Sequence, residues 1–222
     1  MTNATFAAAR AFVFDLDGTL IDSKMDLVNS VNAMLRQTGR TELPTDLIAS
    51  YVGHGAPQLI TTTLGPASTD AERKEALAIF LKHYNEQKLN ETRPYPGVTE
   101  GLRALADSGV SMAVLTNKPT QLSLEILEGL QLAKFFRSIY GGDSFPTRKP
   151  DPTGVLTILR ELGATPNQSA MVGDSDVDMQ TARNAEMIAV GVNYGFGQHD
   201  RGKCPADTYV DSLEELTSFV RK

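Results

Sequence analysis

Short apolar runs alternate with longer amphipathic segments along most of this chain. Apolar runs too short for helices predict buried strands at residues 11–14, 110–115, about 136–140, 169–172 and 187–192, and a short edge strand near 208–210. Amphipathic segments predict helices over about 98–108, 120–131, 152–162 and 177–185, and a last helix capped by Ser212 and Glu215 that runs to the C-terminus. Repeated strand–helix units imply a doubly wound, mostly parallel sheet with helices on both faces, which is a Rossmann-like α/β core.

Residues 21–93 interrupt this alternation with helical patterns alone. Four helices are predicted there, from Ser23 to about Gly39, near residues 46–51, over residues 57–64 and from Thr69 to Leu89. The two long helices begin with pairs of the capping-box type, Ser23 with Asp26 and Thr69 with Glu72. We therefore expect an α/β core of residues 1–20 and 94–222 and an inserted α-helical domain of residues 21–93, with a proline-rich hinge at 93–97.

Composition narrows the class of protein. The 222 residues suffice for one core domain and a modest insertion. The net charge is −6 and no basic block is present, so we expect no nucleic-acid partner. No apolar run is long enough to span a membrane, and no leader-like segment precedes the first strand, so we expect a cytoplasmic protein. The single cysteine, Cys204, excludes an internal disulfide framework.

The first predicted strand ends in a pair of carboxylates, Asp15 and Asp17, followed by Gly18 and Thr19. The two acids stand at i and i+2 where the strand ends, so both can turn toward one point, and Gly18 lets the backbone bend behind them. Such a pair suits a hard cation such as Mg²⁺, and it also suits an aspartyl nucleophile with a carboxylic acid–base beside it. The same residues are also typical of an ordinary turn.

Two later segments offer groups that can bind an anion. Thr116 and Asn117 follow the strand at 110–115, where a hydroxyl and an amide can donate to a phosphoryl oxygen or cap the next helix. Lys149 lies in the rigid sequence Arg148-Lys149-Pro150-Asp151-Pro152, from which its charge could neutralise a phosphate and a group of carboxylates. A solvated loop lysine is the ordinary alternative.

A further acidic group follows the strand at 169–172. Asp174 ends this strand, and Asp176 and Asp178 lie at the start of the next helix. Three acids within five residues repel one another unless a cation offsets their charge. The helix dipole explains Asp176 and Asp178, but it explains Asp174 less well. All of these segments lie at the carboxyl ends of parallel strands, where such sheets bind ligands, so we expect one shared site.

The order of these segments resembles the haloacid dehalogenase-like hydrolase superfamily. Its signatures are D-x-D-x-T, a Thr or Ser at a strand end, a Lys, and G-D-x-x-x-D, which are matched here by Asp15 to Thr19, Thr116, Lys149, and Gly173 to Asp178. The resemblance covers essentially the whole chain, and the ordered set is far more specific than any single motif. Three local stretches look like the phosphoglycolate phosphatase branch: residues 51–55 (Tyr-Val-Gly-His-Gly), 93–97 (Arg-Pro-Tyr-Pro-Gly) and 116–118 (Thr-Asn-Lys).

The resemblance implies phosphoryl transfer to an aspartate, followed by hydrolysis. Asp15 would attack phosphorus, and Asp17 would protonate the leaving alkoxide and then activate water. Mg²⁺ would be held by the Asp15 carboxylate, the Asp17 backbone carbonyl and Asp174. Thr116 and Lys149 would stabilise charge on the phosphoryl oxygens.

The remaining implied roles concern substrate contacts and positioning. Asn117, Gly18 and Thr19 would contact the substrate, and Asp178, with Ser175, would orient Lys149 or a metal-bound water. The helical insertion would be a cap that covers the site and recognises the leaving group. Within it, the loop Gly53-His54-Gly55 could turn His54 toward the substrate or leave it exposed.

The resemblance therefore implies a small-molecule phosphate ester as the substrate. We expect 2-phosphoglycolate first, with another small phosphate ester or pyrophosphate as the alternatives. We expect the protein to be a monomer or a homodimer. A haloacid dehalogenase would need neither Asp17 nor a metal. A phosphonate hydrolase would need a Schiff-base lysine in the cap, where nothing marks Lys24 as desolvated. The mutase branch carries a His about a dozen residues after the nucleophile, where this chain has Leu27. An inactive binding module on this fold would not need the intact set of acids and lysine.

Overall fold

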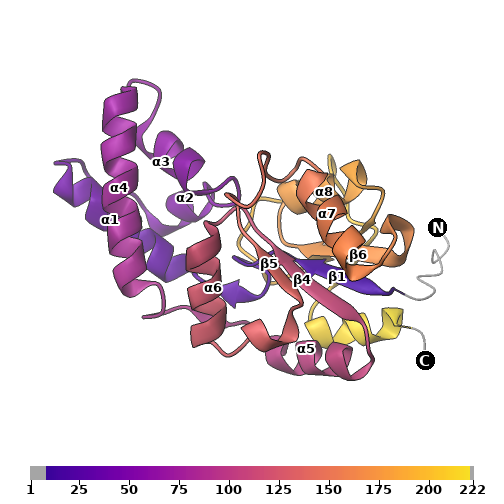
Figure 1. Ribbon diagram of the computed structural model, residues 1–222. Coiled ribbons are helices and arrows are strands. Elements are labelled where there is room, and N and C mark those ends of the chain that lie inside the picture. The colour runs from indigo at the N-terminus through magenta and orange to yellow at the C-terminus, as the bar shows by residue number, and fades with distance from the viewer. Residues whose placement is uncertain (1–8, 221–222) are drawn as a thin grey trace.

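The computed structural model describes residues 9–220 as an α/β core with a helical segment to one side (Figure 1). Residues 1–8 and 221–222, which belong to the expected core and to the expected C-terminal helix, lie outside the described residues. The core contains a parallel six-stranded sheet in the order β5-β4-β1-β6-β7-β8. Its strands are β1 Ala11–Phe14, β4 Ser111–Leu115, β5 Ser138–Tyr140, β6 Ser169–Gly173, β7 Ile188–Val192 and β8 Thr208–Val210.

The centre of the sheet is β1, between β4 and β6. Phe14 pairs in register with Val114 on one side and with Val172 on the other. The carboxyl ends of these strands are therefore level, and the residues that follow each strand lie at one edge of the sheet. The expected α/β fold is confirmed, including the position of β8 at the edge.

Both faces of the sheet are covered by helices because side chains along each strand alternate between them (Figure 1). Phe12 and Phe14 pack on one face, and Ala11 and Val13 pack on the other. The first face is covered by α5 Val98–Asp107, α6 Thr120–Gly129 and the 3₁₀ helix η3 Leu213–Phe219, and the second by α7 Thr153–Leu162 and α8 Asp176–Asn184. Two short 3₁₀ turns, η1 Ala133–Phe135 and η2 Pro166–Gln168, join elements of the core.

The last predicted helix is present, but its winding differs from the expectation of a regular helix. The capping box of Ser212 and Glu215 is formed, and it starts the 3₁₀ helix η3 rather than an α-helix. Leu213 and Leu216 are fully buried against α5, and their spacing of three residues matches the three-residue turn of a 3₁₀ helix.

The inserted helical segment, called the cap from here on, consists of α1 Lys24–Gln37, α2 Thr45–Ala49, α3 Ala56–Leu64 and α4 Asp70–Gln87. In α4, Ala76, Phe80 and Tyr84 recur every four residues and are buried, and the rings of Phe80 and Tyr84 stack with centroids 5.7 Å apart. The cap joins the core through two short antiparallel strands, β2 Ile21–Asp22 and β3 Arg93–Pro94. The proline-rich hinge thus includes strand pairing that the sequence did not indicate.

Of the two capping boxes predicted in the cap, one is confirmed and the other is wrong. At the start of α4, the Glu72 backbone N–H donates to Thr69 Oγ1, and Glu72 Oε2 accepts from the Thr69 backbone N–H. At the start of α1, the Ser23 hydroxyl makes no cap and donates instead to Asp17. Asp26 is fully buried and faces the chain that returns from α4 to the core, which offers it better donors than its own helix does.

No helix in the described range 9–220 is long and apolar enough to cross a membrane.

Asp26 joins the first helix of the cap to the end of the cap, and its removal should destabilise the protein. Its carboxylate accepts from the backbone N–H of Glu91 at 3.0 Å, the backbone N–H of Thr92 at 2.9 Å and the Thr92 hydroxyl at 2.7 Å. Asp26→Ala would leave these donors buried without an acceptor, at a cost of about 2–3 kcal/mol in the free energy of unfolding. Urea unfolding measures this cost, with Asp46→Ala on the exposed side of α2 as the control; equal stabilities of the two variants would contradict it.

Candidate active site

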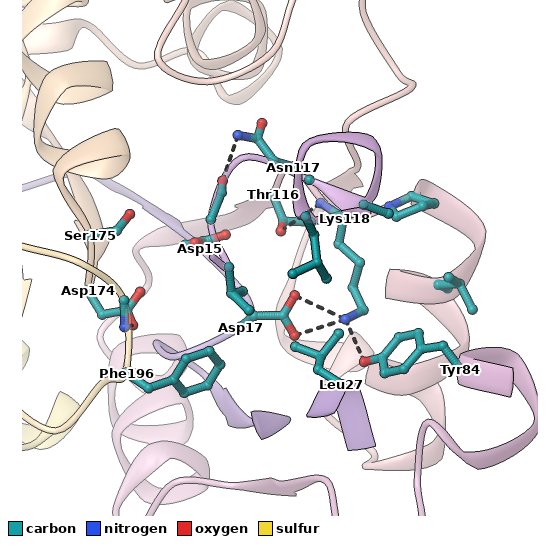
Figure 2. Close-up of a pocket in the computed structure, with 18 of the residues that line it drawn as sticks. Asp15, Asp17, Leu27, Tyr84, Thr116, Asn117, Lys118, Asp174, Ser175 and Phe196 are labelled. Carbon is teal, nitrogen blue, oxygen red and sulfur yellow. Dashed lines mark hydrogen bonds and ion pairs between the residues drawn. The ribbon is translucent and has the colours of Figure 1, made fainter. Parts of the chain in front are cut away.

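The carboxyl ends of β1, β4 and β6 bring the predicted segments together at one cavity between core and cap (Figure 2). Asp15 continues β1, and its backbone N–H donates to Val172 in β6 at 2.9 Å. Thr116 continues β4, and Asp174 follows β6. Asp15, Thr116 and Asp174 are each less than a tenth exposed and line the cavity.

Lys149 reaches the site from the loop before α7 and is buried between two carboxylates. Its Nζ lies 2.9 Å from Asp15 Oδ1 and 2.6 Å from Asp178 Oδ1. Burial alone would lower the pKa of Lys149, but the attraction of Asp15 and Asp178 outweighs it and raises that pKa. Lys149 is therefore a charged group fixed beside Asp15, and the alternative of a solvated loop lysine is excluded.

Asp178 is in turn held by the start of α8. Its Oδ2 accepts from the Ser175 backbone N–H at 3.1 Å and from the Ser175 hydroxyl at 2.6 Å, which forms a capping box at the N-terminus of the helix. One carboxylate thus caps its helix and fixes Lys149 at the same time. This is the contact expected of a residue that orients Lys149.

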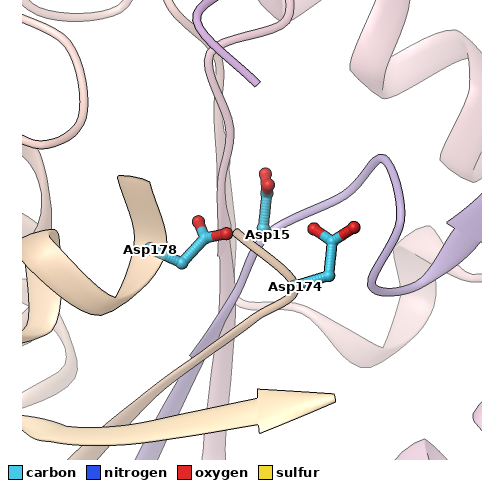
Figure 3. Close-up of side chains that lie close together, drawn as sticks. All are labelled: Asp15, Asp174 and Asp178. Atoms are coloured by element: carbon cyan, nitrogen blue, oxygen red, sulfur yellow. The ribbon is translucent and has the colours of Figure 1, made fainter. Parts of the chain in front are cut away.

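Three buried carboxylates, from Asp15, Asp174 and Asp178, gather at this point with oxygens within 4.8 Å of one another (Figure 3). Burial, with repulsion from Asp178, raises the pKa of Asp15 to about 6 against the attraction of Lys149. Burial, with repulsion from Asp178 and Asp15, also holds the pKa of Asp174 well above its usual value. The group carries more negative charge than Lys149 can balance.

A bound cation would balance the remaining charge, and the donor set fits a hard one. All three donors are carboxylate oxygens, the ligands that Mg²⁺ and Ca²⁺ prefer. Asp15 Oδ1 has the Lys149 ammonium 2.9 Å away as its ion-pair partner, and a carboxylate has lone pairs left for a further ligand. The oxygens of the three carboxylates therefore suit a metal ion.

Gly18 and Thr19 lie against Asp174. Gly18 has φ +83°, and a Cβ at this position would stand 1.9 Å from Asp174 Oδ2, so only glycine fits there. The Thr19 hydroxyl lies 3.5 Å from Asp174 Oδ1, and the Gly197 backbone N–H donates to Asp174 Oδ2 at 2.6 Å. These contacts place Gly18 and Thr19 around a candidate metal ligand; their expected contacts with substrate stay a prediction.

The carboxylate of Asp17 turns away from the three-acid group and faces the cap. Its two oxygens lie 2.9 and 3.0 Å from Lys118 Nζ, and Oδ1 also accepts from the Ser23 hydroxyl at 2.5 Å. Lys118 Nζ donates to the hydroxyl of Tyr84 in α4 at 2.6 Å. Asp17 was expected to bind the metal through its backbone carbonyl. That role does not depend on where the side chain points, and it stays a prediction.

Asn117 connects three loops through its side chain. Its Nδ2 donates to the backbone carbonyl of Gly53 in the cap at 2.9 Å and to that of Lys149 at 3.0 Å. Both hydrogens of the Asn117 amide group are therefore donated to backbone carbonyls, and a contact of Asn117 with substrate stays a prediction. The Thr116 hydroxyl accepts from the Lys118 backbone N–H at 3.3 Å, which leaves its own hydrogen for another acceptor.

His54 is exposed on the loop between α2 and α3, and it is not among the residues that line the cavity. Its neighbours Gly53 and Gly55 do line the cavity. The structure therefore brings the backbone of this loop, rather than the imidazole, to the site. A contact of His54 with substrate stays a prediction.

Several side chains that line the cavity were not expected there from the sequence, among them Lys118, Tyr84 and Phe196. Lys118 stands two residues after Thr116, so the alternation of an extended chain could have placed it on the same side. Tyr84 continues the buried spacing of Ala76 and Phe80 on α4. Phe196 lies in the loop after β7, and no motif marks it.

Loss of Asp174 should stabilise the metal-free protein in a pH-dependent manner. Because the pKa of Asp174 is raised by folding, its contribution to stability is full below the unfolded pKa near 4 and is lost as the pH rises through the folded pKa. In EDTA, Asp174→Asn should therefore unfold a few degrees above the wild-type protein at pH 8, and this gain should shrink at pH 5. Mg²⁺ should raise the Tm of the wild-type protein and not that of the variant.

Thermal unfolding with and without Mg²⁺ measures both effects, and Asp176→Asn, at the exposed side of the same helix N-terminus, is the control. A variant that Mg²⁺ stabilises as strongly as it stabilises the wild-type protein would exclude Asp174 as a metal ligand.

Comparison with known proteins agrees with this geometry. The family described as "Haloacid dehalogenase-like hydrolase" matches residues 12–192. Proteins named phosphoglycolate phosphatase are similar: that of Pseudomonas putida is 41% identical over 209 residues, 92% of this chain and 75% of its own length, and that of Nitrosospira multiformis is 36% identical, with 96% of each chain covered. A crystal structure titled as a predicted phosphoglycolate phosphatase from Haemophilus somnus superposes with a TM-score of 0.89 at 30% identity, covering 97% of this chain and 99% of that one. The chain belongs to the haloacid dehalogenase-like hydrolase family.

Proposed function

We propose that this protein is a Mg²⁺-dependent phosphatase that hydrolyses a small phosphate monoester, 2-phosphoglycolate, through an aspartyl-phosphate at Asp15. The observation that carries the proposal is the placement of Asp15 beside Lys149 and Asp174, with Asp17 facing the same cavity. The names of relatives that are 36–41% identical over most of the chain support the substrate.

In the first step, a carboxylate oxygen of Asp15 forms a bond to phosphorus while the bond from phosphorus to the leaving oxygen breaks. Asp17 gives a proton to the leaving alkoxide. In the second step, Asp17 takes a proton from water, whose oxygen attacks phosphorus and releases inorganic phosphate from Asp15. Lys149 and the Thr116 hydroxyl stabilise the charge on the phosphoryl oxygens in both steps.

The carboxylates of Asp15 and Asp174 and the backbone carbonyl of Asp17 would hold Mg²⁺, and Asp178 with Ser175 would keep Lys149 in place. When bound, the ion supplies positive charge that offsets repulsion between the carboxylate nucleophile and the phosphoryl oxygens. In the metal-free protein the pKa of Asp15 is raised to about 6 by burial, so a cation nearby also favours the ionised nucleophile.

The cap completes the proposal. Residues 21–93 would cover the site and contact the leaving group, and residues 1–20 and 94–222 would carry the chemistry. Leu27 lines the cavity where the mutase branch has its His, so this position offers no proton carrier for a mutase reaction. A monomer or homodimer is part of the proposal, and so is a location in the reducing cytoplasm, which the unpaired Cys204 supports.

Phosphate release from a panel of esters tests the proposed function directly. The panel holds 2-phosphoglycolate, acetyl phosphate, an aryl phosphate and pyrophosphate, each with Mg²⁺ and with EDTA. We expect release in Mg²⁺ alone, with 2-phosphoglycolate the best substrate, and none from Asp15→Asn, because an amide does not attack phosphorus. Asp17→Asn should lose about 10²–10⁴-fold in kcat. Full activity in EDTA, or in Asp15→Asn, would contradict the mechanism.

Lys149→Met should damage the turnover of every ester alike, because Lys149 acts on the phosphoryl group that all of them share. The loss of one charged donor to the transition state should cost about 10²–10³-fold in kcat. Lys203→Met is the control, because it removes an exposed lysine that pairs with Asp200. Losses that differ widely between acetyl phosphate and 2-phosphoglycolate would assign Lys149 to the leaving group instead.

A further inference from the structure

Lys118 is a buried ammonium that the proposed mechanism does not use. Its side chain is 5% exposed and lies at the interface between the core and α4 of the cap. It makes three hydrogen bonds, to the two oxygens of Asp17 and to the hydroxyl of Tyr84, and Nζ also lies 4.3 Å from the centre of the Tyr84 ring (Figure 2). These contacts account for all three donors of an ammonium group.

Lys118 brings a positive charge to a cavity wall that is otherwise acidic or uncharged. Among the described residues that line the cavity, Lys118 is the only one with a cationic side chain. The cap side of the wall is apolar, with Leu27, Leu59, Phe80 and Leu81. Beside an apolar wall a single buried charge discriminates more strongly between charged and neutral ligand groups than it would in bulk water.

The N-terminal end of α3 adds positive potential at the same cavity. Two residues at the start of this nine-residue helix line the cavity: Gly55, which is its N-cap residue, and Ala56, which is its first helical residue. Backbone N–H groups at a helix start carry partial positive charge that favours an anion.

Asp17 shows that Lys118 accommodates a carboxylate. The two oxygens of Asp17 stand at ordinary hydrogen-bond distances from Nζ, and Tyr84 holds the third donor. Asp17 also accepts from the Ser23 hydroxyl, so it can give up one of its two bonds to Lys118 and still be hydrogen-bonded. A second carboxylate, from a ligand, can take that donor.

We propose that Lys118 determines the specificity of the site by binding a carboxylate on the leaving group of the phosphate ester, while Tyr84 of the cap holds its ammonium in place. The inference rests on the proposed function, and it divides the two buried lysines: Lys149 stands beside the nucleophile Asp15, and Lys118 beside the acid–base Asp17. The phosphoryl group and the leaving group of one small ester lie on these two sides. Esters with a neutral leaving group are then poorer substrates.

Two esters that differ in one group test this role. In 2-hydroxyethyl phosphate, a neutral CH₂OH group replaces the carboxylate of 2-phosphoglycolate. The wild-type protein should prefer 2-phosphoglycolate by about 10–100-fold in kcat/KM, the effect of one hydrogen bond to a charged group. Lys118→Met should bring this ratio close to one, mainly through a higher KM for 2-phosphoglycolate. Lys118→Arg should retain part of the preference, and Tyr84→Phe should lower it less than Lys118→Met does.

Lys24→Met is the matched control. Lys24 lies at the start of α1, with Nζ 5.7 Å from the ring centre of the cavity residue Phe196, but Lys24 does not itself line the cavity. The preference of Lys24→Met for 2-phosphoglycolate over 2-hydroxyethyl phosphate should therefore equal that of the wild-type protein. Should Lys118→Met prove inactive, calorimetry on Asp15→Asn and on Asp15→Asn with Lys118→Met, both with Mg²⁺, gives the same ratio from the dissociation constants of the two esters.

Three results separate the proposals. A preference that survives in Lys118→Met would overturn the inference and leave Lys118 as a partner of Asp17 alone. A wild-type protein that turns over both esters equally well would also overturn it. If the wild-type protein released phosphate from neither ester, the proposed function would fail, and the dissociation constants would still decide whether Lys118 selects a carboxylate.

Discussion

An ammonium group buried between two carboxylates is the interaction on which the geometry of this site depends. Lys149 cannot be buried without partners, because an isolated charge in the interior is very costly. Asp178 supplies one partner at 2.6 Å, and Asp178 is itself fixed by the backbone and hydroxyl of Ser175. The turn from β6 into α8 therefore positions Lys149, and Lys149 positions Asp15. Among the described residues Asp174 forms no ion pair, so a bound cation there would offset charge that Lys149 and its two partners leave unbalanced.

The second lysine shows how the same edge of the sheet reaches the cap. Asn117 and Lys118 are consecutive, yet their side chains serve different neighbours: Asn117 binds the backbone of Gly53, and Lys118 binds Asp17 and Tyr84. One dipeptide after β4 thus contacts both the loop before α3 and the last turns of α4. Charge and hydrogen bonding at the site are shared between core and cap, although the proposed chemistry belongs to the core.

Much of this arrangement could be predicted from the sequence because it follows from local patterns. Apolar runs gave the strands, and acids directly after those runs had to meet at one edge once the sheet was parallel. Contacts set by tertiary packing could not be predicted in this way. Ser23 and Asp26 match a capping box, but Asp17 and Thr92 offer them stronger partners from distant segments. The pairing of Lys118 with Tyr84 depends on how α4 of the cap lies against the loop that follows β4, and no local pattern in either segment contains that information.

The strength of these contacts bears on whether the cap can move. A net hydrogen bond is worth about 1 kcal/mol, and one to a charged group about 1.5–3 kcal/mol. The bonds from Asn117 to Gly53 and from Lys118 to Tyr84 therefore contribute only a few kcal/mol to holding the cap against the core. Opening would break them together, because their donors are adjacent on the core. A ligand that bound Lys118 from the cavity would add a contact only while Tyr84 holds the ammonium, so binding of the leaving group and closure of the cap would reinforce each other.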